Sequence, residues 1–226
     1  VNEDECVRRS KVHDLGFGRQ LWLSMRPKFM GRRIVHNIFQ ILGRLVRIVP
    51  SMAKSRKAGA PPPLVGMKNL EIFNEPNFAK GETPSANATC SALGLGRVAA
   101  MMAARGKLAG REYLSESAWK AMHEHPLKAN MGGMLTTRFT QGGVDCFTPT
   151  DAQSTQAERD FNEGREGFYG WMGLGGSIFQ WHPGLDIGFA FVPTSLHTLD
   201  LFNERGKRYQ GEVLKCIAKI AQEHAD

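Results

Sequence analysis

A glycine-rich stretch, residues 168–194, places the strongest constraint on how this chain can fold. It contains two apolar, aromatic-rich runs, residues 177–182 and 187–192, on either side of a Pro-Gly turn. Such a pattern predicts a β-hairpin. Four glycines gather just before the first run: Gly170, Gly173, Gly175 and Gly176. Glycines there indicate that another strand or a ligand approaches the backbone closely, and composition alone favours a bulged core hairpin.

The length and composition are those of a globular protein. With 226 residues, 42% of them hydrophobic, the chain can form one large domain with a sizeable core. No apolar run reaches the ~18 residues that a membrane-spanning helix needs. The chain begins at Val1 with an acidic segment, and not with a methionine or a basic, apolar signal peptide. We therefore expect a piece of a longer protein or a processed product.

Cysteine and histidine spacing predicts neither a metal site nor a cofactor. The cysteines are far apart and form no C-x-x-C pair: Cys6, Cys90, Cys146 and Cys216. Reduced thiols are the default for an intracellular protein, here cytoplasmic or mitochondrial. His123 and His125 are two residues apart, so on a helix they point to different faces. We expect them at a solvated helix end and not on a metal.

The net charge of +7 comes from the first quarter of the chain. Residues 1–60 carry thirteen Lys and Arg against four Asp and Glu. Apolar residues recur at helical spacing over residues 32–49, with arginines on the opposite side, which predicts an amphipathic helix that Pro50 ends. Its apolar side would either dock on the rest of the protein, as most such helices do, or lie on an anionic membrane surface.

The segment after this helix contains Ser51 and Lys54 in the spacing S-x-x-K. On a helix this spacing puts a serine hydroxyl and a lysine amine one turn apart, so that the amine can help to deprotonate the serine. The chemistry needs a buried helix that continues past the lysine and lowers the pKa of its amine. Residues 55–64 instead bring two cations, a glycine and three prolines, which are typical of an exposed linker. We interpret the match as coincidental.

Three further helices are predicted downstream. The first covers residues 93–102, opened by Ser85 or Asn87, and has a thin, alanine-rich surface suited to close packing. Ser115 has the position of an N-cap for the second, a short helix. The third is an amphipathic helix over residues 203–224.

Strand character elsewhere appears at residues 133–141, whereas residues 148–167 are polar and without periodicity and predict a surface loop. The fold class is therefore α/β (α+β). We expect an antiparallel sheet that contains residues 133–141 and both strands of the hairpin. The terminal helix would cover one face of the sheet and the other helices its second face.

Three groups of residues carry a resemblance to a known family. They are E-T-P-S-A-N at 82–87 with L-G-L-G-R-V at 93–98, L-S-E-S at 114–117, and G-W-M-G-L-G-G-S at 170–177 followed by G-F-A-F-V at 188–192. In this order they resemble the C-terminal half of the serine β-lactamase-related family, which includes penicillin-binding proteins, AmpC-like lactamases and family VIII carboxylesterases. Residues 66–226 would be the C-terminal part of such a domain, and residues 1–65 a basic cap or insert.

The resemblance implies a β-lactamase/transpeptidase-like fold without its N-terminal half, which would leave one edge of the sheet exposed. It places Trp171, Met172 and Gly173 in the family's third motif, usually K-T-G or H-x-G, and makes the N–H of Leu174 an oxyanion-hole donor. Tryptophan in place of the usual Lys or His removes a cation for a substrate carboxylate, which is similar to some esterases of the family.

The family's S-x-x-K serine and its Y-x-N tyrosine would precede Val1. Y-x-S at residues 113–115 and S-x-N at residues 85–87 are out of order, and we interpret both as coincidental. The first hypothesis is the C-terminal portion of a serine hydrolase of small ester or amide substrates, inactive alone. The alternative is a non-catalytic binding or scaffold module, at an anionic membrane surface. A nucleic-acid partner is disfavoured because the basic region lacks interleaved stacking aromatics.

Overall fold

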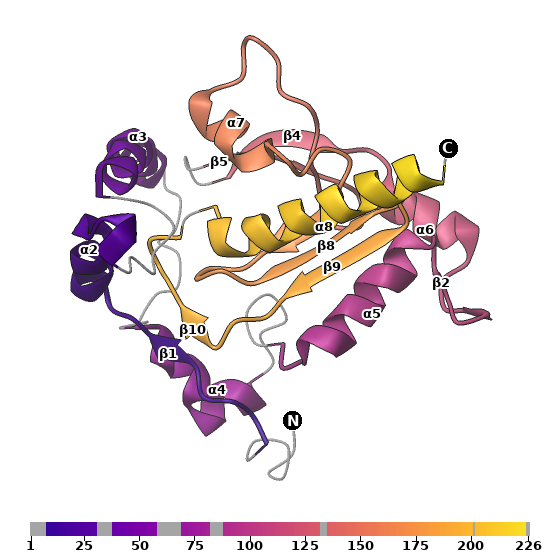
Figure 1. Ribbon diagram of the computed structural model, residues 1–226, viewed down its shortest axis with the longest axis horizontal. Coiled ribbons are helices and arrows are strands. Elements are labelled where there is room, and N and C mark those ends of the chain that lie inside the picture. Colours follow the sequence, from indigo (N-terminus) through magenta and orange to yellow (C-terminus); the bar gives the residue numbers. More distant parts are fainter. Residues whose placement is uncertain are drawn as a thin grey trace.

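The protein folds around a six-stranded antiparallel sheet (Figure 1). This computed structural model describes residues 8–30, 38–57, 69–81, 88–131, 135–200 and 202–224. The strands lie in the order β4-β5-β6-β7-β8-β9, with the bounds β4 Leu127–Met131, β5 Leu135–Phe139, β6 Asp145–Cys146, β7 Tyr169–Met172, β8 Ile178–His182 and β9 Ile187–Phe191.

The predicted hairpin is confirmed. β8 and β9 pair in antiparallel fashion, with Ile178 opposite Phe191 and His182 opposite Ile187. The strand predicted over residues 133–141 is shorter than expected, because β5 has five residues and residues 132–134 lie outside the described part. β4 was not predicted, although it pairs with β5 along its whole length. Its residues are mostly exposed and do not alternate between apolar and polar, so the usual strand signal is missing.

Helices cover both faces of the sheet, as expected. α8, Glu204–Glu223, lies over one face, where a side chain on Gly206 would collide with Ile178. α5, Ala92–Ala103, lies against β9, and its backbone comes so close to Gly188 that a Cβ there would be 2.1 Å from the Ala100 nitrogen. The close approach was predicted for the four glycines before β8, and at Gly170 the neighbouring strand makes it, because a Cβ there would be 2.2 Å from the Phe179 carbonyl oxygen of β8.

Each face has its own hydrophobic core. The first joins Phe147, Phe161, Met172, Ile178 and Phe202 between the sheet, α7 (Gln156–Asn162) and the start of α8. The second joins α5 to the indole of Trp181 and to α6, Glu116–His123. The Ser115 hydroxyl accepts a hydrogen bond from the Ala118 N–H (3.2 Å), which confirms it as the N-cap of α6.

One cap and one loop were predicted wrongly. The N-cap of α5 is Ser91, whose hydroxyl accepts from the Gly94 N–H (3.0 Å), and residues 85 and 87 lie outside the described part. Residues 148–167 are not only loop, because they contain α7, Gln156–Asn162. Thr155 and Glu158 form a reciprocal capping box there, so the signal was the T-x-x-E spacing rather than hydrophobic periodicity.

The N-terminal region is helical and lies to one side of the sheet, at the left of Figure 1. It contains α2, Phe17–Met25, the 3-10 turn η1, Lys28–Met30, and α3, Ile38–Lys57. Pro50 does not end α3, contrary to the prediction. A proline within a helix costs about 3 kcal/mol, but the residues after it include good helix formers such as Met, Ala, Lys and Arg. The helix therefore continues for seven residues beyond Pro50.

Short elements connect this region to the rest. β1, His13–Asp14, pairs in parallel with β10, Ser195–Leu196, which follows β9. The remaining elements are η2 Leu70–Asn74, α4 Pro76–Lys80, β2 Lys107–Leu108 and β3 Arg111–Glu112. Within the described ranges, no helix has the length and apolar character that crossing a membrane requires.

Candidate active site

The third motif proposed from the sequence, residues 171–173, leads from β7 into a tight loop. The Gly176 N–H closes the loop by donating to the Gly173 carbonyl (3.2 Å). Gly176 has a φ of +124°, which other residues rarely adopt, and a Cβ there would collide with the guanidinium of Arg205. We call residues 173–177 the glycine loop.

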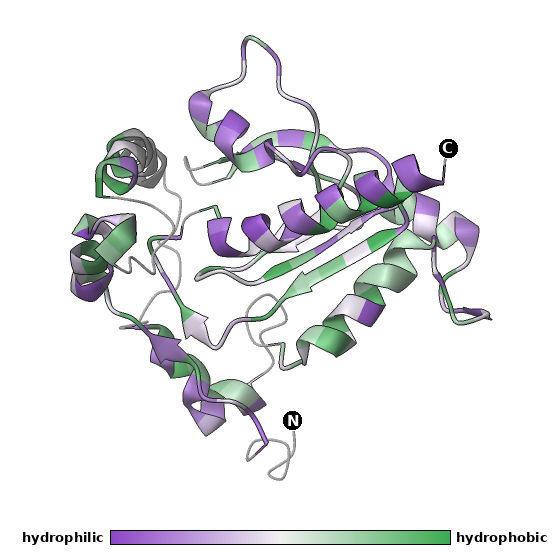
Figure 2. Ribbon diagram, viewed as in Figure 1, coloured by the Kyte–Doolittle hydropathy of each residue, from purple (hydrophilic) through white to green (hydrophobic). Residues whose placement is uncertain are grey.

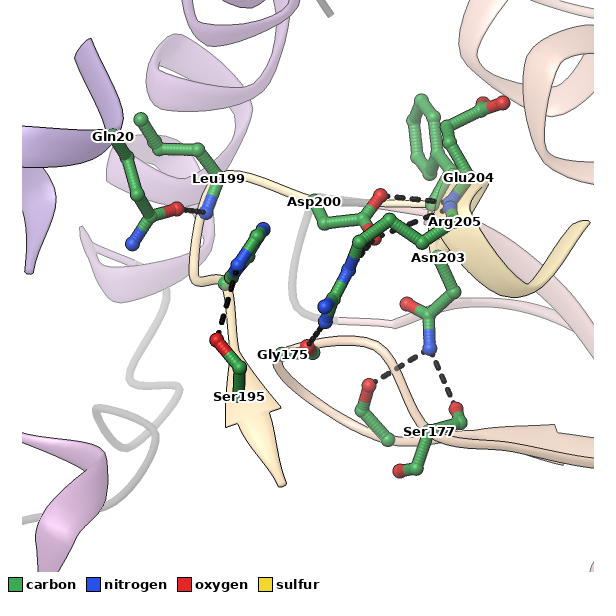
Figure 3. Close-up of polar contacts among 12 residues, drawn as sticks. Gln20, Gly175, Ser177, Ser195, Leu199, Asp200, Asn203, Glu204 and Arg205 are labelled. Atoms are coloured by element: carbon green, nitrogen blue, oxygen red, sulfur yellow. Dashed lines mark hydrogen bonds and ion pairs between the residues drawn. The ribbon is translucent and has the colours of Figure 1, made fainter. Parts of the chain in front are cut away.

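Two side chains from the start of α8 hold the carbonyls of this loop (Figure 3). The side-chain amide of Asn203 donates to the carbonyls of Gly173 (2.9 Å) and Ser177 (2.6 Å). The guanidinium of Arg205 donates to the carbonyl of Gly175 (2.6 Å). Three carbonyl groups of one short loop are therefore fixed by the same turn of one helix.

We call Asn203 and Arg205 the clamp, and both residues are themselves held in place. Asp200 is buried and accepts hydrogen bonds from the Glu204 N–H (2.7 Å) and from Nε of Arg205 (3.3 Å). The first bond satisfies a backbone N–H at the start of α8, and the second orients the guanidinium. Asn203 is buried in the left-handed conformation, with a φ of +52°. Asparagine adopts this conformation more readily than most residues. The clamp is thus a preorganised unit.

This clamp determines where the N–H of Leu174 points. The Gly173 carbonyl and the Leu174 N–H belong to one planar peptide unit, and every described peptide bond is trans. Because the two groups of a trans unit point in opposite directions, an inward carbonyl turns the N–H away from the clamp. The Leu174 side chain is 52% exposed, and no described residue accepts a hydrogen bond from its N–H. Among the described residues, this donor therefore has no partner.

Trp171 lies in β7, is half-buried and packs against the first hydrophobic core. Its ring packs against Phe139 (centroid distance 4.9 Å) and Phe161 (6.1 Å). The sequence predicted that tryptophan removes a cation from this position, and the structure shows what the indole does instead: it fills space between the sheet and α7. The packing of this indole therefore fixes the end of β7, where the glycine loop begins.

A serine and a histidine that the sequence analysis did not single out lie next to the loop. Ser195 Oγ is 3.3 Å from Nε2 of His197, and the His197 N–H donates to the Gly175 carbonyl (3.0 Å). Burial and the nearby charge of Arg205 lower the pKa of His197, which favours the neutral imidazole. The contact does not fix which atom is the donor, so it does not by itself assign a nucleophile and its base. The i, i+2 spacing in S-L-H was the only signal available.

The structure bears differently on the two motifs that we interpreted as coincidental, S-x-x-K at residues 51–54 and Y-x-S at residues 113–115. Ser51 and Lys54 both lie in α3, which ends three residues after the lysine, and their side chains are outside the described part. The S-x-x-K assignment therefore stays a prediction. In Y-x-S at residues 113–115, the serine hydroxyl is the N-cap of α6 and the tyrosine is exposed, so this motif is structural.

His123 is not solvated, contrary to the prediction, whereas His125 is exposed as expected. The Nδ1 of His123 lies 2.7 Å from the Trp119 carbonyl, and its Nε2 accepts a hydrogen bond from the indole N–H of Trp181 (2.9 Å). Because Nε2 is the acceptor, Nδ1 carries the proton of the neutral ring. The described residues hold no cluster of His, Cys, Asp and Glu suited to a metal ion, and Cys90, Cys146 and Cys216 are unpaired.

Comparisons with known proteins give one informative match. No protein-family model matches the chain, and no curated protein matches it significantly. The crystal structure of a penicillin-binding protein homologue from Caulobacter crescentus is similar over 71% of this chain, with 21% sequence identity and a TM-score of 0.52. The chain spans 39% of the length of that protein. At this identity the likeness establishes the fold, which is β-lactamase/transpeptidase-like.

Proposed function

We propose that this chain is the C-terminal portion of a serine hydrolase related to the β-lactamases, acting on esters or amides through an acyl-enzyme. In this proposal the glycine loop supplies an oxyanion-hole donor and one wall of the substrate site. The nucleophilic serine, its lysine and the tyrosine belong to sequence upstream of Val1. The 226-residue chain is then inactive alone.

The observation that carries the proposal is the N–H of Leu174, which has no partner among the described residues. A tetrahedral intermediate of acyl transfer develops negative charge on one oxygen, and a preorganised N–H that needs no reorientation stabilises it best. The clamp of Asn203 on the Gly173 carbonyl provides that preorganisation (2.9 Å). Support also comes from the fold, because this loop follows a strand of a β-lactamase-like sheet.

Trp171 supports esters over penicillin-like substrates. A β-lactam carboxylate is favoured by a cation near the loop, and at this position the chain has an indole packed against the core. The guanidinium of Arg205 already binds the Gly175 carbonyl and Asp200. We therefore expect short acyl esters to be better substrates than penicillins.

The test begins with a search for coding sequence upstream of Val1, and uses the longer protein that this sequence would encode with p-nitrophenyl butyrate as the substrate. Leu174→Pro removes the N–H and should lower kcat by about 10²–10³, the usual effect of losing one oxyanion donor. Leu174→Ala keeps the N–H and should retain activity. Equal activity of both variants, or the absence of any upstream coding sequence, would contradict the proposal.

A further inference from the structure

We propose that the outer side of α2, η1 and α3 binds the interface of an anionic lipid membrane. The surface that makes the contact consists of Trp22, Met25 and Phe29 from the first two elements and Phe39, Leu42 and Val46 from α3. We call these six residues the outer apolar surface. The proposal does not depend on the hydrolase function, so either can fail alone.

The first observation is that α2 buries polar side chains and exposes apolar ones. Its fully buried side chains are polar: the amide of Gln20 accepts from the Leu199 N–H (3.0 Å) and donates to the Thr198 hydroxyl (3.1 Å), and Ser24 is buried beside it. Its exposed side chains include Trp22, at 57% exposure. The helix is thus attached to the protein by hydrogen bonds and presents apolar side chains outward.

The second observation is that α3, which contacts α2, exposes apolar side chains as well. Ile41 is buried at 1% exposure, whereas Phe39 is 80% exposed, and Leu42 and Val46 are exposed as well. Residues 39, 42 and 46 follow a spacing of three and four, so they lie along one side of the helix. α2 and α3 contact each other, and Figure 2 shows hydrophobic residues on both. The prediction that the apolar side of this helix docks on the protein is therefore only partly correct.

The third observation is charge. The described parts of this region, residues 17–30 and 38–57, contain eight Lys and Arg and no Asp or Glu. Arg19 and Arg26 are exposed, and neither forms an ion pair with a described residue. The guanidinium of Arg26 lies 6.0 Å from the centre of the Trp22 ring, which brings cation and aromatic to the same place.

These features together select the occupant. An anionic membrane offers a dense layer of negative headgroups directly above an apolar layer, and each Lys or Arg near this layer strengthens the attraction. Helices that lie in this interface combine apolar and aromatic residues on one side with Lys and Arg, and tryptophan prefers the interface. A protein partner would need an apolar surface that is surrounded by Asp and Glu and carries no Lys or Arg. An anionic lipid membrane combines apolar chains with negative headgroups wherever it is contacted.

The experiment is flotation of the 226-residue chain with vesicles of phosphatidylcholine, and with vesicles of equal parts phosphatidylcholine and phosphatidylglycerol. We expect binding to the mixed vesicles that weakens with added salt. Phe39→Ser with Val46→Ser, and separately Arg19→Glu with Arg26→Glu, should each weaken it about tenfold or more. Leu127→Ser and Lys107→Glu alter exposed residues elsewhere and should leave it unchanged.

A second readout does not depend on these variants. Vesicles with brominated acyl chains should quench tryptophan fluorescence in the chain, and Trp22→Phe should abolish the quenching, because the indole of Trp181 is buried and those of Trp119 and Trp171 are packed against the cores. Equal binding to both vesicle types, or no quenching, would overturn the proposal. So would a dimer in solution that the Phe39 and Val46 variant dissociates, since a second copy would then cover this surface.

Discussion

Helices α5 and α2 differ in what they bury, although both are short helices at the side of the same sheet. α5 buries Ala99 and Ala103 against the sheet, and it exposes Leu93 and Val98 on its other side. α2 instead buries Gln20 and Ser24 and exposes Trp22. α5 is held by the close approach of its backbone and small side chains to the sheet, and α2 by a few hydrogen bonds.

This difference separates two regions of the molecule. From α5 to α8, the chain closes its own cores, and the glycine loop is fixed by buried polar residues. In α2 and α3, much apolar surface stays uncovered. The lesson is that helical periodicity indicates a helix but does not say which side the protein covers. The predictions below test this contrast.

The largest expected effect comes from adding one methyl group in each region. Gly188→Ala places a Cβ 2.1 Å from the Ala100 nitrogen of α5 and should destabilise the protein by about 3 kcal/mol or more. Gly43→Ala, in α3, meets nothing within 4 Å and should stabilise the protein by up to about 1 kcal/mol, because alanine favours helices. Urea unfolding of both variants is the measurement. Similar losses in both would show that α3 is as tightly packed as α5.

The second prediction compares neighbouring positions of α3. Ile41→Ala removes a buried side chain and should cost about 2–4 kcal/mol, whereas Phe39→Ala should change the free energy of unfolding by less than about 0.5 kcal/mol. Both are measured by chemical denaturation without lipid. A large loss for Phe39→Ala would mean that this ring is covered in solution.

The third prediction concerns the clamp. Asn203→Ala removes two hydrogen bonds and a residue suited to a φ of +52°, and should cost about 2 kcal/mol. Asn203→Gly loses the bonds but tolerates the φ, so it should cost less. Amide hydrogen exchange at Gly176, whose N–H closes the loop, should accelerate in both variants. Unchanged exchange would show that the loop holds its shape without the clamp.

Local signals predicted the C-terminal half of the fold well. The Pro-Gly turn between two aromatic runs gave β8 and β9, the Ser115 cap gave the start of α6, and residues 203–224 gave α8 within one residue at each end. The fold class followed from these elements and the family resemblance. Each of these signals depends only on residues close together in the sequence, so it can be recognised without knowing the tertiary structure.

Signals that depend on distant residues were missed. The sequence placed Leu174 just after the third motif. It could not show that Asn203, about thirty residues later, binds the Gly173 carbonyl and so turns the Leu174 N–H away from the clamp. The pairing of His123 with the Trp181 indole spans 58 residues and has no local pattern. Ser51 and Lys54 stay untested for another reason, since their side chains are outside the described residues.

The smallest expected effect is a pH dependence from His123 in the closed region. Burial lowers its pKa from the usual 6.5, and its hydrogen bond to the Trp119 carbonyl opposes this only in part. The unfolded chain then binds the proton more tightly, so stability contributed by the neutral ring is present above about pH 6.5 and is lost as the pH falls through the lower folded pKa. His123→Gln, which keeps an acceptor for Trp181, should reduce this slope between pH 7 and pH 5, as measured by thermal unfolding. An unchanged slope would assign it to other groups.

The most direct test of the central claim, that this chain supplies an oxyanion donor but no nucleophile, is labelling with a serine-reactive fluorophosphonate. The modified residue is located by peptide mass spectrometry. We predict no labelled serine in the 226-residue chain, and a label upstream of Val1 in the longer protein. Labelling of the short chain at Ser51, or at Ser195 beside His197, would contradict the account, because the chain would then contain its own nucleophile.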